Sequence, residues 1–247
     1  LYMNKIDVIY RNNSKNLNKR SASTTDKIIA MVPVRAGSTR VPNKNIRPFG
    51  DTNLLELKLK LLKKINEIFS IVVSTDCKHS AKIAWKQGVE VHWRNKFYAG
   101  SNITNDQHWE HIAQSTPGKI VFLAQVTSPL IRIRTMHSAL KKFLASNEHD
   151  SINSVTSEKK FLWKNGKPIN YDVNLTPKSQ DLPNIVSLNF AITVIKKEVM
   201  IKRKNVVGYK PTFFELDKTE SLDIDDLIDF KLAELMYKEL GFDWLVN

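Results

Sequence analysis

Short apolar runs alternate with amphipathic stretches along most of this 247-residue chain, and no other feature restricts its fold as strongly. Four apolar runs have the length of buried strands: 27–33, 70–76, 89–93 and 119–126. Four stretches carry apolar residues at helical spacing: 54–65, 79–88, 106–115 and 134–146. The alternation predicts an α/β fold in which helices cover a doubly wound, mostly parallel sheet.

Three parts of the chain depart from this rhythm. Residues 1–26 are rich in Asn, Ser and Thr, so we predict a flexible N-terminal extension before a single domain over 27–247. Regularity weakens over about 151–188, where an Asn-Gly pair between apolar residues predicts a hairpin within a protruding arm. The pattern over 221–240 predicts a strand that runs into an amphipathic helix.

The net charge and the cysteine content give only general expectations about binding partners and cellular location. The formal net charge is +13, but the 38 Lys and Arg residues are spread along the chain, so nucleic acid is not the expected partner. The apolar runs are too short to span a bilayer, and no membrane association is expected. The single cysteine, Cys77, and the polar first residues favour a cytoplasmic location, with a nuclear one as the alternative in a eukaryote.

The segment VPVRAGSTRVPNKN, residues 32–45, follows the first predicted strand and has the chemistry of a phosphate site. Gly37 lets the backbone approach a ligand closely, and the Ser38 hydroxyl can donate to a phosphate oxygen. The cations able to neutralise phosphate charge are Arg35, Arg40 and Lys44. The segment is neither a Walker A motif nor a dinucleotide fingerprint, and a solvated turn is an equally weighted interpretation.

The stretch SLDIDD, residues 221–226, adds a second kind of chemistry. In an extended segment Asp223 and Asp225 project to one side while Ile224 points into the core. Two carboxylates on one face suit Mg²⁺, which commonly bridges to substrate phosphates. The alternative is that Asp225 or Asp226 caps the following helix, and both interpretations can hold together. A cationic loop with paired carboxylates favours nucleotidyl transfer.

The opening segment resembles the first motif of the CMP-sugar synthetases, the cytidylyltransferases that activate sialic acids and related acidic sugars. The likeness covers Lys27 to Leu240 and continues through further motifs in the family's order. These motifs are IVVSTD, RNKFYAGSNIT, LAQVTSPL, QDLP followed by LNFAI, and SLDIDD. The resemblance implies a Rossmann-like nucleotidyltransferase that forms a homodimer in which the arm of one chain covers the neighbour's site.

The resemblance also implies roles for individual residues. The positions matching the CTP-binding residues are Arg35, Ser38, Thr39, Arg40, Lys44, Asn45 and Arg94. Thr39 stands where sialic acid members often carry Lys, so Arg40 is expected to supply that cation. Gln125 and Asn189 match residues that contact the acidic sugar, and Asp223 and Asp225 match the Mg²⁺ ligands. The residues expected to carry catalysis are Arg35, Lys44 and Asp225.

The implied reaction joins CTP to an acidic nonulosonate-type sugar, and the QVTSP segment favours the sialic acid branch over the Kdo branch. Several positions depart from the family: Val126, Ser179, Phe190 and Thr193. Phe190 replaces a Gly beside the sugar-contacting Asn, so N-acetylneuraminic acid itself is expected to be a poor substrate. The alternatives are a weak or inactive nucleotide-binding homologue and a nucleotidyltransferase that uses another sugar or base.

One conspicuous pair is given no function. His108 and His111 lie one helical turn apart in HWEH, but no third ligand pattern accompanies them, so a metal site is not expected there.

Overall fold

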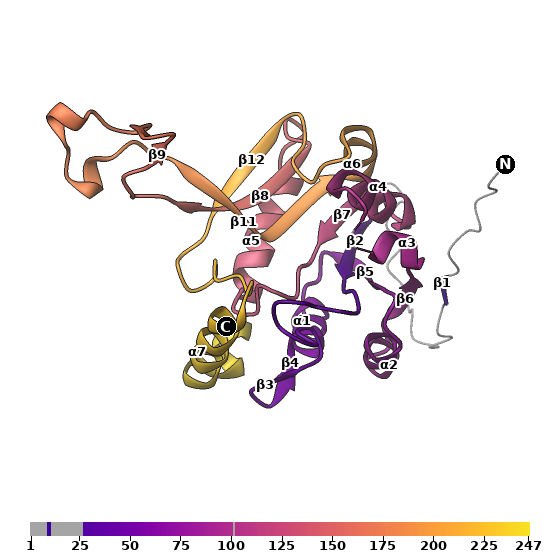
Figure 1. The fold of residues 1–247 in the computed structure, drawn as a ribbon. Coiled ribbons are helices and arrows are strands. Elements are labelled where there is room, and N and C mark those ends of the chain that lie inside the picture. Colours follow the sequence, from indigo (N-terminus) through magenta and orange to yellow (C-terminus); the bar gives the residue numbers. More distant parts are fainter. Residues whose placement is uncertain (1–8, 11–26, 101) are drawn as a thin grey trace.

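The structure is a computed structural model that describes residues 9–10, 27–100 and 102–247. Its centre is an eight-stranded sheet with the strand order β1-β6-β5-β2-β7-β11-β8-β12 (Figure 1). The strands are β1 (Ile9–Tyr10), β2 (Ile28–Pro33), β5 (Ile68–Thr75), β6 (Glu90–Trp93), β7 (Ile120–Leu123), β8 (Ser151–Ser157), β11 (Val186–Lys196) and β12 (Pro211–Glu215). Adjacent strands are parallel except where β1 and β11 meet their neighbours, which confirms the mostly parallel sheet.

Helices follow the strands in the predicted alternation. They are α1 (Leu54–Leu62), α2 (Lys78–Lys86), α3 (Lys96–Ala99), α4 (Asn105–Ser115), α5 (Ile133–Leu144), α6 (Lys197–Arg203) and α7 (Leu227–Val246). Gly88, at the end of α2, has a φ of +66°, as a helix-terminating glycine requires. Among the described residues, no helix is long and apolar enough to cross a membrane.

The strand β2 shows how the sheet separates two hydrophobic cores. Ile28, Ala30 and Val32 pack into the larger core, which also contains buried residues of α1, α2, α5 and α7. The alternate residues Ile29 and Met31 pack into a smaller core with residues of α4 and α6. Because successive side chains of a strand point to opposite faces, a continuous apolar run is what a strand buried on both faces needs.

The segment between β8 and β11 extends away from the sheet in Figure 1. It contains the antiparallel pair β9 (Trp163–Lys164) and β10 (Lys167–Pro168), and the short 3-10 helices η1 (Val173–Leu175) and η2 (Ser179–Asp181). Asn165 and Gly166 join the pair with φ values of 51° and 74°, which confirms the predicted hairpin. A smaller hairpin, β3 (Pro48–Phe49) with β4 (Thr52–Asn53), precedes α1.

Two sequence predictions of secondary structure are wrong. Residues 151–157 form the buried strand β8 rather than irregular chain, because hydrogen bonds satisfy polar groups such as Ser151 and Asn153 inside the sheet. Residues 221–226 form no strand, because the backbone N–H groups of Asp225 and Asp226 donate to the Asp229 carboxylate instead of a neighbouring strand. The predicted flexible extension lies outside the described residues, apart from Ile9–Tyr10, which pair with β6.

Candidate active site at the carboxyl ends of the strands

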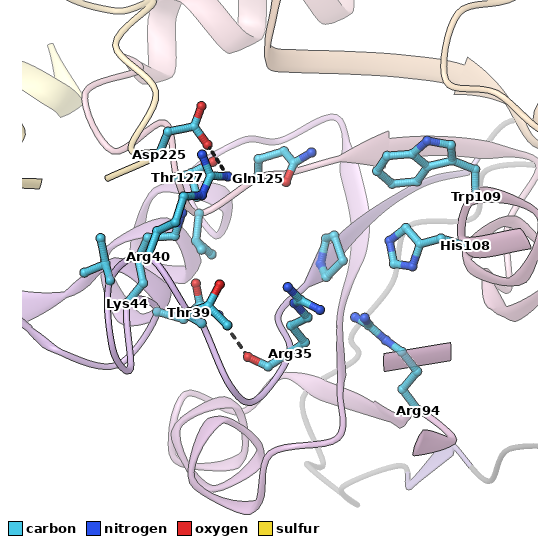
Figure 2. Close-up of a pocket in the computed structure, with 15 residues that line it drawn as sticks. Arg35, Thr39, Arg40, Lys44, Arg94, His108, Trp109, Gln125, Thr127 and Asp225 are labelled. Carbon is cyan, nitrogen blue, oxygen red and sulfur yellow. Dashed lines mark hydrogen bonds and ion pairs between the residues drawn. The ribbon is translucent and has the colours of Figure 1, made fainter. Parts of the chain in front are cut away.

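A cavity of about 230 Å³ lies where β2, β6 and β7 end (Figure 2). All but two of the residues predicted from the sequence line it: Arg35, Ser38, Thr39, Arg40, Lys44, Asn45, Arg94, Gln125 and Asp225. Asp223 and Asn189 are not among the lining residues. Ligands of open α/β sheets bind at this edge, so the cavity is the candidate active site. The roles given to these residues stay predictions.

Short hydrogen bonds hold the loop after β2 against the ends of the neighbouring strands. The Val34 N–H donates to the Ser74 carbonyl at 3.0 Å, and the Ala36 N–H donates to the Asp76 carboxylate at 2.8 Å. Gly37 has a φ of +71°, a conformation that favours glycine. Beyond this turn, buried Val41 anchors the loop in the core. The loop is therefore a shaped wall of the cavity rather than a loose surface turn.

The segment before α7 forms the second wall, to which Asp225 contributes its side chain. The Lys44 ammonium donates to the Ile224 carbonyl at 2.5 Å, and the Arg40 guanidinium pairs with the Asp225 carboxylate at 2.9 Å. Ile224 is fully buried, as predicted, and holds the segment in place. Partial burial lowers the pKa of Lys44, although the nearby aspartates oppose this shift. Both walls thus carry charge into one cavity.

The aspartate that caps α7 is not the one that lines the cavity. The Asp226 carboxylate accepts hydrogen bonds from the Ile228 and Asp229 N–H groups, at 2.8 and 3.0 Å, and therefore caps α7. The Asp225 side chain takes no part in this cap and faces the cavity. The two interpretations of the aspartate cluster therefore hold together, on neighbouring residues.

Asp223 has the electrostatics of a carboxylate that a cation would stabilise. Partial removal of its carboxylate from water raises the pKa of Asp223, and the charge of Asp225 raises it further. A hydrogen bond from the Thr127 hydroxyl and the charge of Lys44 act in the opposite direction. Two mutually repelling carboxylates form an oxygen donor set that suits Mg²⁺.

Among the described residues, no group of three or more His, Cys, Asp and Glu side chains is arranged to hold a metal, so a Mg²⁺ site at Asp223 and Asp225 stays a prediction. A pair of carboxylates would leave the other positions around Mg²⁺ to phosphate oxygens and water, which is how this ion is commonly bound.

Arg94 enters the cavity from the end of β6 and is only 2% exposed. Its guanidinium donates to the Ser74 carbonyl at 2.6 Å and to the Ser74 hydroxyl at 3.2 Å. The same hydroxyl lies 3.0 Å from Nδ1 of His92. Burial lowers the pKa of Arg94 to about 10, which leaves the side chain charged at neutral pH. It is a rigid cation in the cavity wall.

His108 and Trp109 also line the cavity, although no role there was predicted for them from the sequence. Both lie in the first turns of α4, whose start is fixed by a capping box between Thr104 and Gln107. Recognising that capping pattern would have placed His108 near the carboxyl edge of the sheet. His111, its supposed partner, is buried and stacks on the Tyr98 ring at 3.8 Å, so the two histidines serve different environments.

Asn189 is held by its own strand neighbours. Its side-chain oxygen accepts a hydrogen bond from Ser154, and its amide donates to the Thr156 hydroxyl at 2.8 Å. These bonds lie in an irregular part of β11 where the register shifts between Leu188 and Thr193. Asn189 therefore stabilises this bulge in the structure, and its predicted contact with the sugar stays a prediction.

The bulge presents Phe190 in an unusual conformation. Its φ of +56° is a left-handed value that is costly for a bulky residue, and its side chain is 37% exposed. The antiparallel pairing of β11 with β7 reaches Thr193 opposite Leu123. The chain before Thr193 therefore runs toward the segment after Leu123, where Gln125 contributes to the cavity.

A fully buried lysine supports the same edge from α1. Lys58 is 1% exposed, and its ammonium donates to the Ser128 carbonyl at 2.8 Å. Burial lowers the pKa of Lys58 to about 7, although the nearby charge of Asp223 opposes the shift. Lys58 lies among the buried leucines of α1, so the sequence pattern alone does not distinguish it from Lys60, which is partly exposed on the same helix.

Comparison with known proteins places these features in a family. A family model described as Cytidylyltransferase matches residues 29–238. N-acylneuraminate cytidylyltransferase A of Danio rerio is 28% identical over 224 residues, which cover 87% of this chain and 52% of the relative. The chain thus spans about half the length of that curated relative.

Two further matches extend over the full length of the protein to which this chain is similar. CMP-N,N'-diacetyllegionaminic acid synthase of Legionella pneumophila is 28% identical over 236 residues, which are 89% of this chain and 100% of the relative. The solved structure of CMP:2-keto-3-deoxy-manno-octonic acid synthetase in complex with CTP superposes with a TM-score of 0.66 at 12% identity, covering 87% of this chain and 100% of that one. At this identity the structural match shows the fold alone.

Proposed function

The chain belongs to the cytidylyltransferase family, and we propose that it couples CTP to an acidic nonulosonate-type sugar, giving a CMP-sugar and pyrophosphate. The observation that carries this proposal is the meeting of the loop cations and Asp225 in one cavity. Nucleotidyl transfer depends mainly on positioning and on neutralising phosphate charge, and these groups are placed to do both. Relatives named for sialic and legionaminic acids support the choice of sugar class.

The reaction would use the chain's own groups as follows. Arg35, Arg40 and Lys44 bind the triphosphate, and their charges offset the negative charge that spreads over it during transfer. The anomeric hydroxyl oxygen of the sugar attacks the α-phosphorus in line with the bond to the β-phosphate bridging oxygen. That bond breaks, its electrons leave with pyrophosphate, and the hydroxyl proton passes to Asp225 directly or through a water.

The metal is part of the proposal. Asp223 and Asp225 would hold Mg²⁺ together with phosphate oxygens, and the charge of Asp225 that raises the pKa of Asp223 supports this assignment. When bound, Mg²⁺ would neutralise phosphate charge and polarise the α-phosphate. Arg40 would then exchange Asp225 for phosphate, which costs little because both side chains of the present pair are largely exposed.

We also propose that the protein is a homodimer held partly by the protruding segment. Its hairpin and turns expose large apolar side chains: Phe161, Trp163, Ile169, Val173 and Leu175. Leu175 is 80% exposed, and such a concentration of apolar surface is typical of a protein interface. A second copy of the chain is the occupant that the family resemblance implies. The cytoplasmic location expected from the sequence stays a proposal.

Thermal unfolding with nucleotides tests the nucleotide assignment. We expect CTP with Mg²⁺ to raise the melting temperature more than ATP, GTP or UTP, because a ligand that binds only the folded state stabilises it. Equal shifts with all four nucleotides would contradict the cytidine assignment. The absence of any shift would contradict a nucleotide-dependent function altogether.

A further inference from the structure

The cavity has two chemically different ends (Figure 2). Arg40, Lys44 and Asp225 lie at one end, whereas the aromatic side chains of His108 and Trp109 lie at the other, beside Arg94, with Arg35 between the two groups. A triphosphate requires cations, and a planar base requires a flat wall on which it can stack. The base of a bound nucleotide therefore belongs beside His108 and Trp109, with its phosphates toward the loop cations.

The hydrogen bonding of His108 fixes its tautomer. One ring N–H of His108 donates to the backbone carbonyl of Tyr98, which can only accept. A neutral imidazole has one donor nitrogen and one acceptor nitrogen. Since the donor is used by Tyr98, the second nitrogen carries the lone pair.

The neighbours of His108 keep this ring neutral. Burial is the main cause that lowers its pKa to about 4, and the positive charges of Arg94 and Arg35 lower it further. Protonation would place a third cation beside these two arginines. At neutral pH the second nitrogen is therefore an acceptor and cannot become a donor.

The ring is also held in place. The His108 and Trp109 rings make an edge contact with centroids 4.6 Å apart, and both side chains are partly buried in the cavity wall. A fixed acceptor in a partly dry site discriminates strongly between ligand donors and acceptors, because a mismatched polar pair loses its hydrogen bonds to water without replacement.

We propose that His108 selects the base of the nucleotide by accepting a hydrogen bond from the exocyclic amine of cytosine. Uracil carries a carbonyl oxygen at that position, and two acceptors would face each other. This inference rests on the proposed CTP-dependent function and extends it to a specificity-determining residue. Trp109 supplies the stacking surface and does not distinguish the two pyrimidines.

Titration calorimetry of CTP and UTP against three variants tests this role. We expect the unaltered protein to bind CTP at least about tenfold more tightly than UTP. His108→Leu removes the acceptor at similar size, so CTP binding should weaken roughly tenfold to a hundredfold while UTP binding changes little. The ratio of the two affinities should then approach one.

Two matched variants separate selection from folding. His108→Gln can turn either its acceptor oxygen or its NH2 group to the base, so it should bind CTP better than His108→Leu does but prefer it less than the unaltered protein does. Trp109→Phe keeps a stacking ring and should weaken both nucleotides by a similar factor, leaving their ratio unchanged.

The outcomes distinguish this inference from the proposed function. An unchanged affinity ratio in a folded His108→Leu protein would overturn the inference, as would equal binding of CTP and UTP by the unaltered protein. Failure of the unaltered protein to bind any nucleotide would overturn the proposed function together with the inference.

Discussion

The Arg40 guanidinium lies 2.9 Å from the Asp225 carboxylate, and this contact joins the two charged walls of the cavity. Both side chains are largely exposed, so the pair contributes at most about 1 kcal/mol to stability. Such a weak pair can separate when a ligand offers each partner a better one. A bound phosphate would take the place of Asp225 beside Arg40, and Asp225 would then be available to hold Mg²⁺.

Asp225→Asn should lower turnover by roughly a hundredfold or more, because it removes a charge from the proposed metal and proton-accepting site. CTP binding without Mg²⁺ should survive, since the phosphate-binding cations remain. Steady-state kinetics and metal-free calorimetry measure the two effects separately. Asp226→Ala is the matched control, because it should cost about 1 kcal/mol of stability through the lost helix cap and leave most turnover intact. Full activity in Asp225→Asn would show that this carboxylate has no catalytic part.

Lys58 should make stability depend on pH. Its pKa is about 7 in the folded protein, below the ordinary 10.5 expected after unfolding. Between these values the unfolded chain binds the extra proton, so Lys58 makes stability rise as pH increases through this window. Below about pH 7 the charged lysine is buried at its full cost, which is on the order of a few kcal/mol.

Lys58→Met should therefore flatten the rise in the free energy of unfolding between pH 7 and 9, measured by urea denaturation. Lys60→Met, on an exposed part of the same helix, should keep the rise seen in the unaltered protein. If Lys58→Met retains the full rise, the pH dependence has another source. At low pH, the loss of the hydrogen bond to the Ser128 carbonyl offsets part of the stability that Lys58→Met gains. The slope of the free energy of unfolding against pH is therefore the decisive quantity.

Phe190 should limit which sugar is used. Its left-handed backbone places a ring where the resembling family carries a glycine, beside the chain that leads to Gln125. We expect N-acetylneuraminic acid to be a poor substrate and Phe190→Gly to raise its kcat/KM by roughly tenfold or more, because the added space exceeds a methylene. Pyrophosphate release measures both rates. Efficient turnover of this sugar by the unaltered protein would contradict the assignment.

The protruding segment should govern assembly. A double variant in which both Trp163 and Leu175 are replaced by Asp should be a monomer in sedimentation velocity experiments. Charges buried without partners in the interface oppose association. Leu144→Asp, at an exposed apolar position in α5, should leave the dimer intact. A monomeric unaltered protein, or a dimer that persists in the double variant, would exclude this interface.

Much of the fold could be predicted from the sequence because local patterns determine it. The apolar runs of β2 and β7 and the helical spacing of α1 are visible without any knowledge of distant contacts. The strand β8 was missed because its buried polar residues hide the apolar pattern. The hydrogen bonds that these polar residues need come from partners such as Val206 and Asn189, which are far away in the sequence.

The site was predictable where residues belong to compact motifs. The loop from Arg35 to Asn45 and the carboxylate of Asp225 meet as expected. His108 and Trp109 belong to no such motif: the capping box indicates only where α4 begins, and the packing of α4 against the sheet brings them beside Arg94. The burial of Lys58 is likewise a tertiary property that spacing on α1 does not reveal.

The most direct test of the account is to incubate the protein with CTP, Mg²⁺ and, separately, sialic, legionaminic, pseudaminic and Kdo-type sugars, and to measure pyrophosphate and CMP-sugar in the same reactions. We expect at least one of these acidic sugars to give the two products in equal amounts. We also expect that N-acetylneuraminic acid is not the best substrate. If CTP binds but no sugar yields a CMP-sugar, the protein is a nucleotide-binding homologue without transfer activity, and the proposed function is wrong.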